Sequence, residues 1–106
     1  LGEDGIEKIL LDSIKRRSYL ESIIDSSKFK IITGPLHLLA ITPINYNFSQ
    51  ASDWSENTRN SLLKSNFMLS RPIYGDRYYL KAVLGNPNTK FKDLELLANL
   101  INASIN

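Results

Sequence analysis

The sequence contains no cysteine among its 106 residues and only one histidine, His37. Without cysteine the chain can form neither a disulfide nor a thiolate metal site, and one histidine cannot build a histidine cluster. Its 13 lysines and arginines nearly balance 11 acidic residues, for a net charge of +2. Nucleic acid and anionic membranes both require concentrated basic surface, so we expect neither as a partner.

Long apolar runs are also missing. None approaches the roughly 20 residues that span a bilayer, and from the opening residues Leu1 to Asp4 we expect no signal peptide. We therefore expect an ordinary soluble surface and a cytoplasmic protein. The length favours a single domain over residues 1–106. Because the chain starts at leucine, we also expect that the natural protein continues upstream.

The most strand-like stretch begins at Tyr78 and is closed by Asn86-Pro87, because proline lacks the amide that a ladder needs. Lys81 lies in its middle, and a buried unpaired charge costs several kcal/mol, so its ammonium must reach water or an anion. From the residues alone, a solvent-reaching lysine is the first interpretation and an anion-binding lysine the second. One face carries Tyr78, Leu80, Ala82 and Leu84, and the other carries Tyr79, Lys81, Val83 and Gly85.

Periodicity and turn signals place the other elements and predict the order α-β-β-α-β-β-α. This order indicates an α+β fold, an antiparallel sheet of three to four strands with helices on one face. A sheet covered on one side leaves Tyr79, Lys81 and Val83 on a surface suited to docking on something larger. The expected elements are a helix over 2–26, strands over 29–33 and 36–41, a helix over 53–65, a strand over 67–70 and a helix over 91–105.

Capping and turn residues set the expected boundaries. Asp53 and Glu56 fit a capping box after a loop over 44–52, and Thr89 is the expected N-cap of the last helix. Gly75-Asp76 marks a turn into the Tyr78 strand. Thr58, Leu62 and Leu63 are expected to form the inner side of the second helix.

Several other side chains have two interpretations. Arg17 falls within the apolar arc of the first helix, where its stem packs and its head reaches the rim or pairs with a partner surface, whereas Lys15, Arg16 and Asp12 are expected on a solvated face. His37 is expected to be a packed or edge histidine rather than a catalytic base. Trp54 is expected to pack rather than to stack on a cofactor.

An ordered set of motifs resembles the carboxyl-terminal part of pyridoxal-phosphate (PLP)-dependent group II amino-acid decarboxylases. It covers essentially the whole chain, and its most specific element is the strand that ends in Asn86-Pro87. Lys92 stands where the family has an acidic residue in the capping box of the last helix. The motifs are Leu1-Gly2-x-x-Gly5-Ile6, Asn57-Thr58-Arg59, Leu80-Lys81-x-x-x-x-Asn86-Pro87 and Thr89-x-x-x-Asp93-Leu94.

The resemblance implies that this chain is the small C-terminal domain of a fold-type-I enzyme. The Schiff-base lysine and PLP would belong to a large upstream domain, so this fragment would hold no catalytic residue, bind no cofactor and be inert alone, and the parent would be a homodimer. The position of Lys81 is an arginine expected to hold the substrate carboxylate in the glutamate decarboxylase branch. It is a lysine in the diaminobutyrate decarboxylase branch, which this chain resembles more closely, so Lys81 is the implied substrate-binding residue.

A non-enzymatic class remains as the alternative. The same α+β layout would suit a regulatory or interaction module. A nucleic-acid binder would use Tyr78, Tyr79 and Phe91 as stacking platforms beside Arg77 and Lys81.

Overall fold

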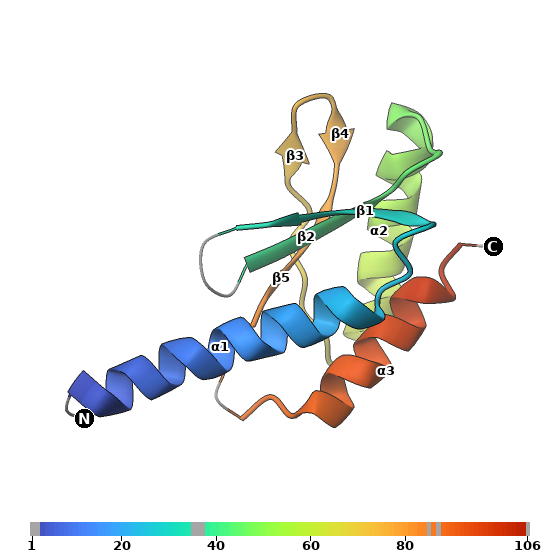
Figure 1. Cartoon of the computed structure of the whole chain (residues 1–106). Coiled ribbons are helices and arrows are strands. Elements are labelled where there is room, and N and C mark those ends of the chain that lie inside the picture. Colours follow the sequence, from blue (N-terminus) through green and yellow to red (C-terminus); the bar gives the residue numbers. More distant parts are fainter. Residues whose placement is uncertain (1–2, 35–37, 85, 87, 106) are drawn as a thin grey trace.

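The computed structural model describes residues 3–34, 38–84, 86 and 88–105. Figure 1 shows a small sheet with helices along one side and a hairpin that rises from the sheet's far end. This is the expected α+β class. The elements of the described residues are α1 (Glu3–Ile23), β1 (Phe29–Thr33), β2 (Leu38–Pro43), α2 (Phe48–Leu63), β3 (Ile73–Tyr74), β4 (Arg77–Tyr78), β5 (Leu80–Val83) and α3 (Phe91–Asn102).

The central sheet is antiparallel, with strand order β1-β2-β5 among the described residues. The register pairs Ile31 with Ile41 and Ile41 with Leu80, so alternate residues of the three strands share one face. That face is buried and carries Phe29, Leu39, Ile41, Leu80, Ala82 and Leu84. The expected division of the last strand into two faces is confirmed for Leu80 to Leu84.

The helices pack on this buried face. Leu20 and Ile24 of α1, Trp54 and Leu62 of α2, and a stripe on α3 join the same core cluster as the sheet residues. The α3 stripe is the expected one, Leu94, Leu97, Ala98 and Ile101. The expected placement of the helices on one face of the sheet is therefore confirmed. No helix in the described part of the chain is long and apolar enough to cross a membrane.

The described residues leave the N-terminal half of α1 uncovered. Figure 1 shows it projecting past the strands, which accounts for the longest dimension of 47 Å. Ile9, Leu10 and Leu11 there are 36%, 37% and 56% exposed. Only the second half of the expected apolar stripe is thus buried within the described residues.

The second helix begins earlier than expected. Asn47, not Asp53, is the N-cap of α2, since its side chain accepts from the Gln50 amide and the Gln50 side chain accepts from the Asn47 amide. Asn47 to Gln50 thus supplies the capping box that was assigned to Asp53 and Glu56. The expected loop over 44–52 is therefore wrong from Phe48 onward. Leu63 was also placed wrongly, because it is 45% exposed while Thr58 and Leu62 are buried.

The expected strand over 67–70 does not form, apart from one bridge between Ser70 and Lys81. Instead, β3 and β4 make a separate hairpin around the predicted Gly75-Asp76 turn, where Gly75 has a φ of 66°.

Lys90 rather than Thr89 precedes α3, and the Asp93 carboxylate accepts from the Lys90 amide at 3.0 Å. Asp93 thus supplies an acidic cap although Lys92 stands beside it. The expected proline stop at Pro87 lies outside the described residues.

Arg16 is buried, and its assignment to a solvated face was wrong. It is 6% exposed, its Nε donates to the Leu84 carbonyl at 2.9 Å, and its Nη2 donates to the Ser13 hydroxyl at 3.1 Å. Leu84 follows the last residue of β5, so this carbonyl lies beyond the paired strand, and a long side chain from α1 can reach it. The half-buried Arg17 donates to the Gly34 carbonyl at 3.0 Å, so its head reaches a backbone group at the end of β1.

We predict that Leu80→Ala lowers the free energy of unfolding by roughly 2 to 5 kcal/mol, because it leaves a cavity under the helices. Leu80 is 0% exposed, whereas Val83 on the same strand is 59% exposed. Val83→Ala is the matched control and should change the unfolding free energy by less than about 0.5 kcal/mol. Urea titration followed by circular dichroism measures both, and equal losses would contradict the assigned faces.

Candidate functional site

The backbone of Lys81 is held on both edges of β5. On one side Lys81 pairs with Ala40 of β2. On the other its amide donates to the Ser70 carbonyl at 2.9 Å, and its carbonyl accepts from the Ser70 amide at 3.1 Å. The base of the side chain is therefore fixed before any ligand arrives.

The side chain of Lys81 projects from the face opposite the helices, because Leu80 and Ala82 on either side are in the core. Ile32, Leu38 and Ala40 share this open face by register. Lys81 is half-buried there. The predicted orientation of Lys81, away from the helices, agrees with the structure.

The hairpin β3–β4 covers part of the open face. Thr42 on that face is 0% exposed, and its hydroxyl donates to the Tyr78 carbonyl at 2.9 Å. The Tyr74 ring lies 5.3 Å from the Tyr79 ring, and Tyr79 is only 3% exposed. Tyr79 was expected on a free docking surface, and this was wrong because the hairpin folds back over it.

Two arginines hold the hairpin in place. Both terminal nitrogens of Arg77 donate to backbone carbonyls, one to Pro43 and the other to Tyr46. Arg71 donates from Nε to the Ser55 hydroxyl at 2.7 Å, and its guanidinium lies 4.0 Å from the centre of the Tyr78 ring. The hairpin is thereby tied to the loop after β2 and to α2.

A cavity of about 290 Å³ lies between the hairpin and the open face, and Lys81 is part of its wall. Tyr74 lines it from the hairpin, and the strands contribute apolar side chains. Sequence reasoning did not single out Tyr74. The turn at Gly75 was visible in the sequence, but the side of the sheet on which the hairpin lies depends on Arg71 and Arg77 reaching distant partners.

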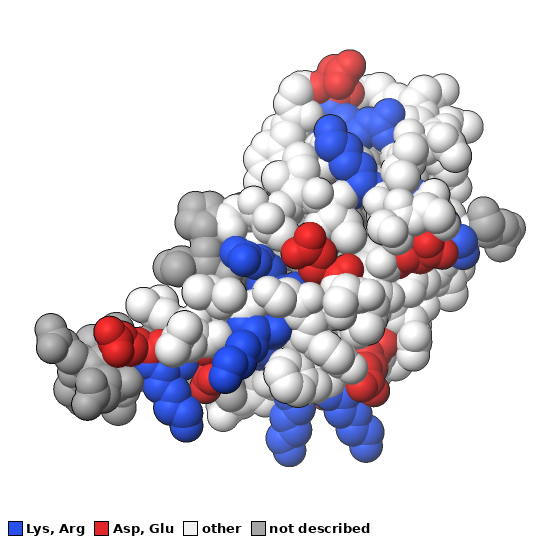
Figure 2. Space-filling view, in the orientation of Figure 1, with Lys and Arg blue, Asp and Glu red and all other residues white. Residues whose placement is uncertain are grey.

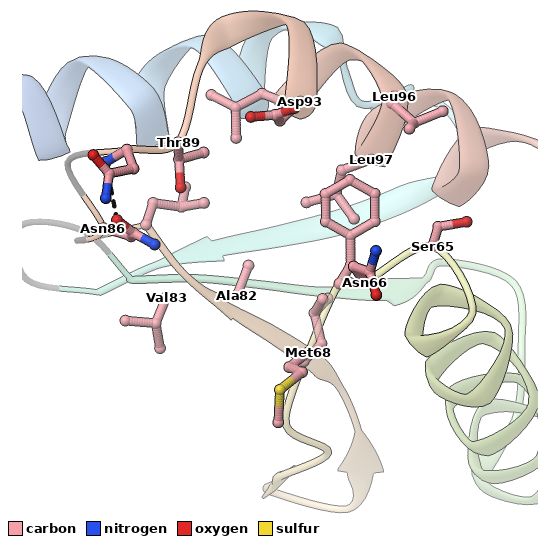
Figure 3. Close-up of a pocket in the computed structure, with 15 residues that line it drawn as sticks. Ser65, Asn66, Met68, Ala82, Val83, Asn86, Thr89, Asp93, Leu96 and Leu97 are labelled. Carbon is pink, nitrogen blue, oxygen red and sulfur yellow. Dashed lines mark hydrogen bonds between the residues drawn. The ribbon is translucent and has the colours of Figure 1, made fainter.

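A larger cavity, of about 470 Å³, lies elsewhere, between the 65–69 segment, the end of β5 and the start of α3. Figure 3 shows Met68 and Val83 at one side of it, with Asn86, Thr89 and Asp93 toward α3. Its acidic residue, Asp93, already caps α3, and no lysine or arginine is among its described lining residues. We take the Lys81 cavity as the candidate site because a half-buried lysine is part of its wall.

The other sequence candidates are accounted for structurally or lie outside the described residues. Trp54 packs as expected, with its ring 5.7 Å from Phe29 and its indole nitrogen donating to the Ser104 hydroxyl at 2.8 Å. His37 lies outside the described residues. No group of three histidine, aspartate or glutamate side chains in the described part of the chain could hold a metal ion.

The aromatic platform for nucleic acid does not assemble. Tyr79 is buried, Tyr78 is half-buried beneath Arg71, and Phe91 contacts Tyr19 at the start of α3. Figure 2 shows basic and acidic side chains interspersed on the face drawn, rather than one basic patch. Base stacking needs exposed rings beside a basic groove, so this arrangement does not support that alternative.

No protein-family model and no curated protein matches the sequence. Solved structures do match the fold. Oryza sativa TDC with PLP has a TM-score of 0.83 at 12% identity, covering 97% of this chain and 24% of that one. Catharanthus roseus tryptophan decarboxylase in complex with L-tryptophan has a TM-score of 0.77 at 15% identity, covering 92% of this chain and 21% of that one.

A third match is the glutamate decarboxylase domain of diaminobutyrate-pyruvate transaminase and L-2,4-diaminobutyrate decarboxylase from Vibrio parahaemolyticus. It has a TM-score of 0.66 at 18% identity, covering 90% of this chain and 21% of that one. The chain therefore shares its fold, over nearly its whole length, with a segment of these decarboxylases. It spans only about a fifth to a quarter of the solved chains that it matches.

We predict that Arg77→Ala loosens the hairpin, because two backbone carbonyls lose a charged donor. The unfolding free energy should fall by about 1.5 to 3 kcal/mol. The Tyr79 amide, which donates to the Pro72 carbonyl at 2.9 Å, should exchange its hydrogen faster. Lys30→Ala removes an exposed cation from β1 and serves as the control. Unchanged exchange at Tyr79 in Arg77→Ala would contradict this anchoring.

Proposed function

We propose that this chain is the small C-terminal domain of a PLP-dependent amino-acid decarboxylase, with diaminobutyrate or a related amino acid as substrate. The observation that carries the proposal is the shared fold over 90% to 97% of this chain with a segment of decarboxylases about four to five times as long. The motif resemblance, which covers the same length of chain, supports it independently.

Two exposed surfaces fit a domain that leans on a larger neighbour. The N-terminal half of α1 exposes Ile9, Leu10 and Leu11, and the open face of the sheet exposes Ile32 and Val83. Burial of such apolar surface would stabilise contact with the rest of the parent polypeptide. We expect the large domain to be that neighbour and the parent to be a homodimer.

The described lining of the cavity at Lys81 does not fit PLP. A lysine for the cofactor aldehyde and a cradle for its phosphate would have to lie together. Lys81 is the only lysine among the described residues that line the cavity on the open face, and the other side chains there are apolar apart from Tyr74. PLP would supply the electron sink for loss of carbon dioxide, and we assign its binding to the upstream domain.

The role proposed for Lys81 is to hold a substrate carboxylate at the domain interface. Its backbone is fixed on both edges of β5 and its side chain projects from the open face. Lysine offers a point charge rather than the planar fork of arginine, so it would hold one carboxylate oxygen at a time.

Decarboxylation should require the upstream segment. The full-length protein, supplied with PLP, should release carbon dioxide from diaminobutyrate, while residues 1–106 alone should release none. Carbon dioxide capture over a panel of amino acids measures both activity and substrate choice. Full-length protein that binds no PLP and acts on none of the panel would refute the proposal and favour the interaction-module class.

In the active full-length protein, Lys81→Ala should lower kcat/KM by roughly tenfold or more, through loss of a charge-assisted bond worth about 1.5 to 3 kcal/mol. Lys30→Ala is the matched control, because Lys30 lies on the same face of the sheet at β1. Its kinetics should match those of the wild type. Unchanged kinetics in Lys81→Ala would return Lys81 to the role of a solvated surface lysine.

A further inference from the structure

Arg16 is a buried cation whose hydrogen-bond partners among the described residues are all neutral. It is 6% exposed, and within the described part of the chain it donates to the Leu84 carbonyl and the Ser13 hydroxyl. Its other terminal nitrogen, Nη1, has no hydrogen-bond partner there. A buried charge is costly unless an opposite charge compensates it, and an anion beside Arg16 would remove that cost.

A cavity of about 340 Å³ lies beside Arg16, between α1 and the start of α3. Lys15 and Lys90 line it as well, so three cations surround one space, and Asp12 is the one acid among its described lining residues. Asp12 makes no hydrogen bond to Arg16 within the described residues. Positive charge therefore exceeds negative charge around the cavity, and a dianion would balance it better than a single carboxylate.

The first turn of α3 adds main-chain donors beside these cations. The Lys90 amide donates to the Asp93 carboxylate. The Phe91 and Lys92 amides, in contrast, have no acceptor among the described residues. The start of a helix carries partial positive charge, and lysines at positions 90 and 92 increase it. An anion at this helix start would offset the repulsion and accept from its amides.

Phe91 gives the cavity an apolar side. Its ring centre lies 4.8 Å from that of Tyr19 on α1, which holds it in place, yet Phe91 remains 49% exposed and lines the cavity. Thr89 adds a hydroxyl group to the lining. The cavity is larger than a phosphate group, so a small organic group attached to the phosphate could lie against Phe91.

We infer that this cavity binds a phosphate group, either inorganic phosphate or the phosphate of a small monoester. Arg16 holds the anion from a fixed position, Lys15 and Lys90 pair with it at the surface, and Asp12 opposes it. The site is separate from the cavity at Lys81, because the two share no described lining residue. The inference goes beyond the proposed function and does not depend on it.

The test uses the full-length protein, equilibrated with PLP and then desalted, so that any cofactor phosphate site elsewhere is filled. Isothermal titration calorimetry at constant ionic strength compares inorganic phosphate, phenyl phosphate and acetate. Both phosphates should bind saturably, and acetate should bind at least about tenfold more weakly, because one negative charge leaves the cations uncompensated. Tighter binding of phenyl phosphate would identify a monoester as the ligand, and equal affinities would identify inorganic phosphate. Either result supports the site.

Surface variants locate the binding. Lys15→Ala and Lys90→Ala should each weaken phosphate binding by about fivefold. Lys92→Ala is the matched control, because Lys92 carries the same charge in the first turn of α3 but is not among the described lining residues. Its affinity should stay within about twofold of wild type. Asp12→Asn should tighten binding by about threefold, because it removes the opposing charge, and a damaged fold would not produce such a gain.

Four results would overturn the inference. They are acetate binding as tight as phosphate, no saturation with either phosphate, equal losses in Lys90→Ala and Lys92→Ala, and no gain in Asp12→Asn. Phosphate binding does not require decarboxylation. A protein that binds phosphate with the expected pattern but decarboxylates nothing therefore refutes the proposed function alone. An active decarboxylase without such binding refutes the inference alone.

Discussion

The burial of alternate residues of β5 under the helices is the constraint on which the rest of the structure depends. Leu80, Ala82 and Leu84 enter the common core, so the residues between them must face the other way. A shift of one residue in the pairing of β5 with β2 would bury Lys81 and expose Leu80. The hydrophobic core therefore fixes the direction of a charged side chain that contributes nothing to that core.

The open face of the sheet has two parts, one covered by the hairpin and one accessible. Around Thr42 and Tyr79 it is covered by the chain's own hairpin, which arginine side chains tie to backbone carbonyls and to α2. Around Lys81 it stays accessible and forms a cavity with Tyr74. Strong charged hydrogen bonds at the base of the hairpin thus protect one end of the sheet and shape a recess at the other.

The fold is supported by likeness to solved structures, whereas the proposed function has to be argued from the residues of the site. The likeness to decarboxylase structures extends over nearly the whole chain. At sequence identities of 12% to 18%, however, it supports the fold alone. A function must be argued from the site. Here that argument depends on Lys81, which is half-buried, backbone-anchored and placed on a face that the chain's helices leave open.

The sequence by itself determined the α+β class, the strand over 29–33, the alternation within β5, the Gly75 turn and the buried stripe of α3. Each of these features is specified by short-range hydrophobic periodicity or by a turn residue, and both act within a few positions of the chain. The start of α2 was missed because Asn47 and Asp53 both begin acceptable capping boxes. Only the longer helix brings Ala51 into the core, where it is 0% exposed.

Only the tertiary structure determined the burial and contacts of Arg16, Tyr79 and Tyr74. Arg16 looks like a surface residue until α1 lies against the end of β5, because its carbonyl partner is 68 positions away. Tyr79 and Tyr74 meet only because Arg71 and Arg77 hold the hairpin over the sheet. Such contacts join residues far apart in sequence, so local patterns cannot specify them, and the recess at Lys81 exists only once they have formed.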